Sequence, residues 1–258
     1  MHRSGIENIK EKFKEIFIIL SPPRCSSTAL ARVFWEHPSI GYYSHEPFEK
    51  TFHHKTTLED ALHFLDNPIQ IKTPGESYLV KEMVFQVHQH FRELVKFTKN
   101  PLTFLIRDPR LSLYSRIEKF EAGKKDPVFP YVEAGWKELK LQLNTARDAE
   151  IPFSIVDATE FRNHPLEILP TLFERLNLSF SPEMICWQPR PDLDLCNLGG
   201  EHHHLYERVL KSSGLQPANE NIPDISAFPL KLQPIVETCL NIYQEIKDDP
   251  ERIHSPGN

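Results

Sequence analysis

The sequence predicts an α/β fold in which a parallel β-sheet is flanked by helices. Short apolar runs, typical of strands buried in a parallel sheet, alternate along the chain with stretches of helical periodicity. Strands that alternate with helices form parallel sheets through crossover connections. The chain has 258 residues, a length that suits one large domain, and no apolar run is long enough to span a bilayer.

Four apolar runs are the predicted strands, at residues 16–21, 78–81, 102–106 and 153–156. The helical stretches between them each place apolar residues on one face. These faces consist of Val87, Phe91, Leu94 and Val95; of Val132, Trp136, Leu139, Leu143 and Ala146; and of Leu166, Leu169, Leu172, Phe173 and Leu176. The third face follows a helix start signal, Asn163-His164-Pro165.

The composition of the chain changes after residue 180, where prolines recur on both sides of one short stretch with a helical pattern. We expect residues 181–229 to form a loop-rich cover over the active face, because loops carry function more often than the scaffold does. Residues 230–248 are expected to form a last amphipathic helix. The whole chain, 1–258, is interpreted as a single domain.

Composition excludes several classes of function. The net charge of −6 argues against a nucleic-acid partner, which needs a basic surface. The four cysteines lack CxxC spacing, which argues against a disulfide framework and a zinc site. The charged N-terminus lacks the apolar stretch of a signal peptide. We therefore expect a cytoplasmic protein without a membrane partner, in which clustered Arg and Lys would hold any anionic ligand.

The stretch ILSPPRCSSTALARVF, residues 19–34, runs from a predicted strand through a proline turn into a helix. Such a turn collects anions through backbone N–H groups and the helix dipole. It is not a Walker A loop, since GxxxxGK[ST] is absent. The candidate anion-binding residues are Arg24, Cys25, Ser26, Ser27 and Thr28. The alternative is an ordinary Ser/Thr helix cap with Arg24 exposed.

A second stretch, TFLIRDPRLSLYSRI, repeats this arrangement at residues 103–117. Arg107 ends the strand, and Ser115 follows eight residues later, two turns into the helix. Arg107 can therefore reach a phosphate over the sheet edge while Ser115 supplies a hydroxyl from the facing helix.

Together these stretches resemble the sulfotransferases that use 3′-phosphoadenosine-5′-phosphosulfate (PAPS). The resemblance covers most of residues 16–180, and with SHEPF and LVKEM it extends to a soluble sulfotransferase-like group. It implies a P-loop-type, sulfotransferase-like fold. It also implies that the loop at 24–28 binds the phosphosulfate, that Arg107 and Ser115 bind the 3′-phosphate, and that no metal is required. The product would be 3′-phosphoadenosine-5′-phosphate (PAP).

The sequence departs from the family pattern at three places. Ser26 stands where the loop usually has glycine, so a left-handed turn there would be strained. The C-terminal Arg-Lys-Gly that holds the 3′-phosphate has no match, and Lys211, Ser212 and Ser213 are possible substitutes. The Lys-x-His triplet that carries a catalytic His in cytosolic sulfotransferases is Lys81-Glu82-Met83 here.

Glu46 is the predicted general base. It lies in GYYSHEPF, in a segment read as a loop, 22 residues after Arg24. Several sulfotransferase groups have a catalytic Glu at about this spacing. The adjacent His45 could act itself or orient Glu46, Lys81 is a candidate second cation near the sulfuryl group, and Arg24 is placed to balance charge on the leaving phosphate.

The predicted function is metal-independent transfer of a sulfuryl group from PAPS to a hydroxyl or amine of a small organic acceptor. Aromatic residues such as Phe48, Phe52 and Phe85 favour that acceptor class over a long acidic polysaccharide. A catalytically silent nucleotide-binding module is the alternative, and an atypical P-loop phosphotransferase is a third reading.

Overall fold

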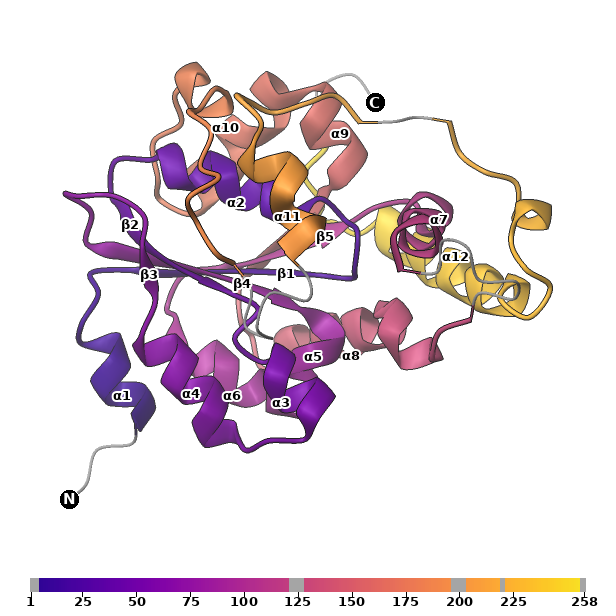
Figure 1. The fold of residues 1–258 in the computed structure, drawn as a ribbon, viewed down its shortest axis with the longest axis horizontal. Helices are drawn as coiled ribbons and strands as arrows, with labels where there is room; N and C mark the ends of the chain where they lie inside the picture. The colour runs from indigo at the N-terminus through magenta and orange to yellow at the C-terminus, as the bar shows by residue number, and fades with distance from the viewer. Residues whose placement is uncertain (1–4, 121–127, 196–202, 219–220, 256–258) are drawn as a thin grey trace.

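The computed structural model describes residues 5–120, 128–195, 203–218 and 221–255. Its centre is a sheet of six strands in the order β3-β2-β4-β1-β5-β6 (Figure 1). Their bounds are Ile16–Ser21 (β1), Ile40–His45 (β2), Ile69–Gln70 (β3), Ser77–Met83 (β4), Leu102–Ile106 (β5) and Phe153–Asp157 (β6). Neighbouring strands are parallel except β2 and β3, which are antiparallel. The predicted α/β fold is confirmed.

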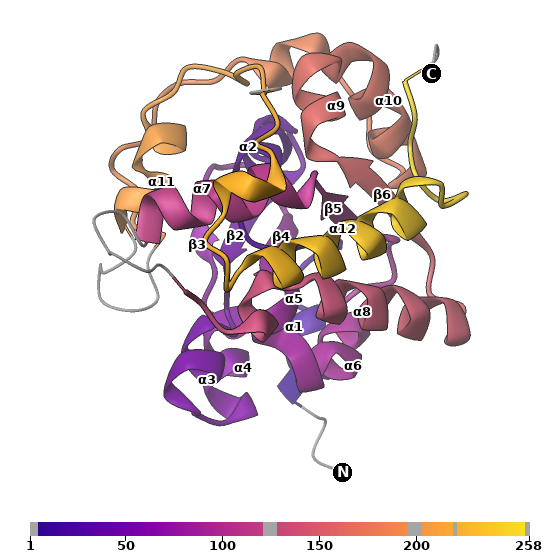
Figure 2. The same cartoon turned by 90° about the vertical axis from the view of Figure 1, so that its right-hand side faces the viewer.

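Helices cover both faces of this sheet (Figures 1 and 2). The α-helices are Gly5–Lys10 (α1), Ser27–Glu36 (α2), Glu49–His54 (α3), Leu58–Asp66 (α4), Val84–Val87 (α5), Phe91–Leu94 (α6), Pro109–Phe120 (α7), Trp136–Asp148 (α8), Ala158–Asn163 (α9), Pro165–Arg175 (α10), His203–Leu210 (α11) and Gln233–Lys247 (α12). Short 3-10 turns are His88–His90 (η1), Val95–Phe97 (η2), Tyr131–Ala134 (η3), Pro182–Ile185 (η4) and Ile225–Ala227 (η5).

The core has two parts, one on each face of the sheet. Helices α2, α9, α10 and α11 lie on one side, where they enclose a cluster that includes Phe34 and Phe173. Helices α1, α4, α5, α6, α8 and α12 pack on the other side, around Phe104 and Trp136. Alternate side chains of each buried strand enter opposite clusters, which is why the strands read as continuous apolar runs.

The strands with continuous apolar sequence were predicted correctly. β1 and β5 have the predicted bounds, while β4 and β6 extend beyond them. The prediction missed β2 and β3. The segment 40–45 was read as part of a loop because its tyrosines, serine and histidine break the apolar run, but the polar groups of Tyr43, Ser44 and His45 are paired internally. Tyr78 Oη, for example, donates to Ser44 Oγ at 2.6 Å.

Two predicted helical faces are interrupted in the structure. The face of Val87, Phe91 and Leu94 is buried as predicted, but His88, with φ 25° and ψ −105°, divides the segment into α5, η1, α6 and η2. Gly135, with φ 77°, separates η3 from α8, so Val132 lies outside that helix. The third helix begins at Pro165 as its start signal predicted.

The described parts of 181–229 contain only η4, α11 and η5 as helical turns, and α12 follows at Gln233. The described parts of this segment, which we call the C-terminal cover, begin on the side of α2 and pass over the carboxyl end of the sheet toward α12 on the other side (Figure 1). In the part of the chain that the structure describes, no helix is long and apolar enough to cross a membrane.

Candidate active site

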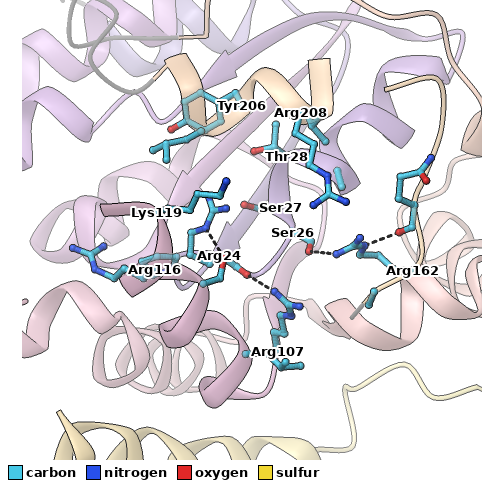
Figure 3. A pocket seen from close by; sticks show the side chains of 18 of the residues that line it. Arg24, Ser26, Ser27, Thr28, Arg107, Arg116, Lys119, Arg162, Tyr206 and Arg208 are labelled. Atoms are coloured by element: carbon cyan, nitrogen blue, oxygen red, sulfur yellow. Dashed lines mark hydrogen bonds between the residues drawn. The ribbon is translucent and has the colours of Figure 1, made fainter. Parts of the chain in front are cut away.

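A cavity of about 1330 Å³ lies where the carboxyl ends of the parallel strands meet (Figure 3). Open parallel sheets bind ligands at this edge, where successive connections leave in opposite directions. The residues after β1, β2, β4 and β5 line the cavity from below, and the C-terminal cover lines it from above. The sheet therefore brings together residues that are far apart in sequence.

The loop after β1 contributes Arg24, Ser26, Ser27 and Thr28 to the cavity lining. Arg24 and Ser26 both have left-handed backbone conformations, with φ of 62° and 60°. These turns lead directly into α2, whose N-terminus favours a bound anion. The side chain of Ser26 does not cap that helix; its Oγ accepts a hydrogen bond from Arg162 Nη1 at 3.2 Å instead. The left-handed turn anticipated at Ser26 is present.

Cys25 points away from the cavity. Its side chain is fully buried in the core, and its Sγ lies 3.7 Å from the carbonyl oxygen of Pro23. Burial raises the pKa of this thiol to about 12. Of the five predicted loop residues, Cys25 is thus the one that does not line the cavity, and its side chain cannot contact a ligand there.

Arg107 and Ser115 both contact the loop after β1. Nη1 of Arg107 donates to the carbonyl oxygen of Arg24 at 3.3 Å. Nε of Arg24 donates to Ser115 Oγ, also at 3.3 Å. Nε of Arg107 is buried without a hydrogen-bond partner in the described residues. The two motifs therefore form one connected polar surface with donor capacity left for a ligand.

Glu46 also lines the cavity, as the first residue after β2. Its carboxylate forms an ion pair with Lys81 Nζ and accepts a hydrogen bond from Gln86 Nε2 at 3.0 Å. Tyr206 Oη, from α11 in the cover, donates to Glu46 Oε1 at 3.3 Å. Burial alone would raise the pKa of this carboxyl, but the positive charge of Lys81 holds the pKa well below its ordinary value of 4.5.

His45 and Lys81 lie behind Glu46 rather than in the cavity lining. The side chain of Lys81 is fully buried. His45 Nε2 lies 3.3 Å from Glu46 Oε1, and its Nδ1 lies 2.5 Å from Tyr43 Oη. Burial and the charge of Lys81 lower the pKa of His45, so a neutral imidazole orients the carboxylate. Of the predicted catalytic groups, Glu46 and Arg24 can touch a ligand, and His45 and Lys81 support Glu46.

The prediction missed several polar residues of the cavity. Arg162 follows β6, and Tyr206 and Arg208 belong to α11 (Figure 3). Arg116 and Lys119 lie on α7, where Arg116 pairs with Glu133. No local motif marks these residues, since each reaches the site only through the packing of its own helix. Of the aromatic residues suggested for an acceptor pocket, Phe85 lines the cavity, whereas Phe48 is buried in the core.

The cavity concentrates positive charge in an acidic protein. Within the described ranges, no carboxylate lies within ion-pair distance of Arg24, Arg107, Arg162 or Arg208. Burial lowers the pKa of Arg24 and of Arg107, because each guanidinium has lost part of its hydration. Guanidinium groups without counterions in a cavity suit phosphate or sulfate ligands. Among the described residues, no group of three or more His, Cys, Asp or Glu side chains could hold a metal ion.

Comparison with known proteins identifies the fold. No family model matches the chain, and no curated protein matches its sequence. Solved structures do match. A sulfotransferase domain from the curacin biosynthetic pathway superposes with a TM-score of 0.51 at 18% identity, over 91% of this chain and 98% of that one. The sulfotransferase domain of the Synechococcus PCC 7002 olefin synthase gives 0.50 at 17% identity, over 88% and 95%. The chain therefore has a sulfotransferase-like fold.

Proposed function

We propose that this protein is a PAPS-dependent sulfotransferase that acts on a small organic acceptor. The observation that carries the proposal is the junction of the two sequence motifs, in which Arg24 contacts Ser115 through its side chain and Arg107 through its carbonyl oxygen. An Arg-rich cavity at the carboxyl edge of a sulfotransferase-like fold is the expected place for a ligand with two separate phosphate groups.

In the proposed complex, Ser26, Ser27, Thr28 and the N-terminus of α2 hold the 5′-phosphosulfate. Arg107 and Ser115 hold the 3′-phosphate. The acceptor oxygen or nitrogen attacks sulfur, and the bond between sulfur and the bridging phosphate oxygen breaks. Arg24 balances the negative charge that develops on that oxygen. Each cation stays charged through the reaction, since Arg does not deprotonate at neutral pH.

Glu46 takes the proton that the acceptor loses. Its carboxylate is held in place by Lys81, Gln86 and Tyr206 and remains ionised at neutral pH. The lowered pKa keeps Glu46 in the ionised form that can accept a proton, and the nucleophile becomes more acidic as its bond to sulfur forms. Phe85 and Tyr206 give this end of the cavity an aromatic lining, which favours a small organic acceptor.

Calorimetric titration in the presence of a chelator tests the proposal, with PAP, AMP and ATP as ligands. We expect PAP to bind more tightly than AMP, because only PAP carries a 3′-phosphate. Binding that requires ATP with Mg²⁺ would contradict the proposal and indicate phosphoryl transfer. If PAP binds but a broad acceptor screen with PAPS gives no product, the protein is a nucleotide-binding module without turnover.

A further inference from the structure

The side chain of Arg162 contacts both the loop after β1 and the C-terminal cover, which are far from it in the sequence. It lies in α9, which follows β6 and packs in the same core cluster as α2. Its Nη1 donates to Ser26 Oγ at 3.2 Å, while Nε and Nη2 donate to the carbonyl oxygens of Gln216 and Pro217 at 2.8 and 2.7 Å (Figure 3). One planar guanidinium thus holds the loop and the C-terminal cover in a fixed relation.

The neighbouring residue strengthens the connection to the cover. Oδ1 of Asn163 accepts a hydrogen bond from the backbone N–H of Ala218 at 2.7 Å. The last turn of α9 therefore holds residues 216–218 through three hydrogen bonds, all to backbone atoms of the cover. The position of residues 216–218 therefore depends on the Arg162 and Asn163 side chains, which bond to the backbone of this segment.

Charge makes this arrangement sensitive to a ligand. Arg107, Arg162 and Arg208 reach the cavity from the end of β5, from α9 and from α11. Burial, together with the positive charges of Arg107 and Arg208, lowers the pKa of Arg162 to about 10. The group is still charged at neutral pH. In the described residues no carboxylate lies within ion-pair distance of any of the three, so a bound anion would relieve their mutual repulsion.

We propose that Arg162 is a positioning residue that couples occupation of the phosphate site to the placement of the C-terminal cover. An anion bound at the Ser26 loop reduces the repulsion among the three arginines and stabilises residues 205–218 in the position that the structure shows. That segment includes Tyr206, which contacts Glu46. Nucleotide binding therefore stabilises this contact with the base before the acceptor reacts. The proposal rests on the proposed function for the identity of the anion.

Hydrogen exchange measured by mass spectrometry tests this coupling, with PAP and inorganic pyrophosphate as separate probes. Arg162→Gln removes the charge and the three-way contact. Arg190→Gln is the matched control, because Arg190 also anchors the cover, through Nη1 to the carbonyl oxygen of Ile71 at 3.0 Å, but does not line the cavity. At saturating PAP, we expect exchange in 205–218 to slow by about 10-fold in the wild type and in Arg190→Gln, and by less than about 2-fold in Arg162→Gln.

The outcomes separate this proposal from the proposed function. The coupling is overturned if PAP protects 205–218 fully in Arg162→Gln. It is also overturned if PAP binds the wild type without protecting this segment. Either result leaves the proposed function standing. Pyrophosphate that binds and protects as well as PAP overturns the nucleotide assignment and supports the coupling. Failure of both probes to bind overturns both. If Arg162→Gln does not fold, Ser26→Ala removes the acceptor of Nη1 and must reduce the protection for the coupling to hold.

Discussion

Nη1 of Arg107 lies 3.3 Å from the carbonyl oxygen of Arg24, so the end of β5 supports the turn that follows β1. The turn needs this support because Arg24 has φ 62°, a conformation that side chains with a Cβ rarely adopt. Arg107 therefore has two roles in the proposed site. It provides positive charge for a phosphate, and it holds the backbone of the loop on which the other phosphate would bind.

Arg107→Ala is expected to weaken PAP binding by about 10- to 100-fold, which corresponds to charge-assisted hydrogen bonds worth about 1.5–3 kcal/mol. AMP, without a 3′-phosphate, should lose less. Arg110→Ala is the control: Arg110 pairs with Asp108 and does not line the cavity, and its removal changes the net charge equally. Calorimetric titration of both variants measures the difference. Equal losses of PAP affinity in the two variants would show that Arg107 acts only through the net charge of the protein and not through direct contact with the ligand.

Glu46→Gln is expected to lower turnover by at least about 100-fold, the usual contribution of a general base. The single variant leaves the buried charge of Lys81 without its partner, a change that costs about 3–5 kcal/mol. The informative protein is therefore the double variant Glu46→Gln, Lys81→Met. It should recover most of the stability, bind PAP and remain inactive. Activity in this stable double variant would remove Glu46 as the base.

The same ion pair predicts how stability depends on pH. The pKa of Glu46 is lower in the folded protein than its ordinary value of 4.5, so its contribution is complete above that pH. It is lost as the pH falls from about 4.5 through the folded pKa, because the unfolded chain then binds a proton that the folded chain does not. Urea unfolding between pH 7 and pH 3 should show this decline in the wild type. The decline must be smaller in the double variant, which has neither charge.

The sequence predicted those parts of the site that are fixed locally. Arg107 and Ser115 belong to one strand–helix unit, so their spacing determines their separation before any packing is known. The segment 40–45 was missed because Tyr43 and His45 satisfy each other's polar groups inside the sheet, which the pattern of apolar residues does not show. Arg162 could not be predicted either, since its contacts with Ser26 and Gln216 depend on the placement of α9 beside β6.

Cys25 is expected to resist alkylation at neutral pH, although its place in the anion-binding loop suggests a reactive thiol. Burial raises its pKa to about 12, so almost no thiolate is present, and its side chain is inaccessible. Cys186 is exposed and provides the internal control. After brief treatment with iodoacetamide, mass spectrometry should find Cys186 modified and Cys25 intact, with both modified in urea. Rapid modification of folded Cys25 would place its thiol in the cavity.

Ser26→Gly and Ser26→Ala together measure the strain in the loop. Both substitutions remove the hydroxyl that accepts from Arg162, and they differ only in the Cβ atom. At φ 60° that atom costs about 1–2 kcal/mol, partly offset by the greater freedom of glycine in the unfolded chain, about 0.5–1 kcal/mol. The Gly variant should therefore unfold at a higher urea concentration than the Ala variant, with a free energy of unfolding larger by about 0.5–1 kcal/mol. An Ala variant of equal or greater stability would mean that the left-handed turn at Ser26 is absent in solution.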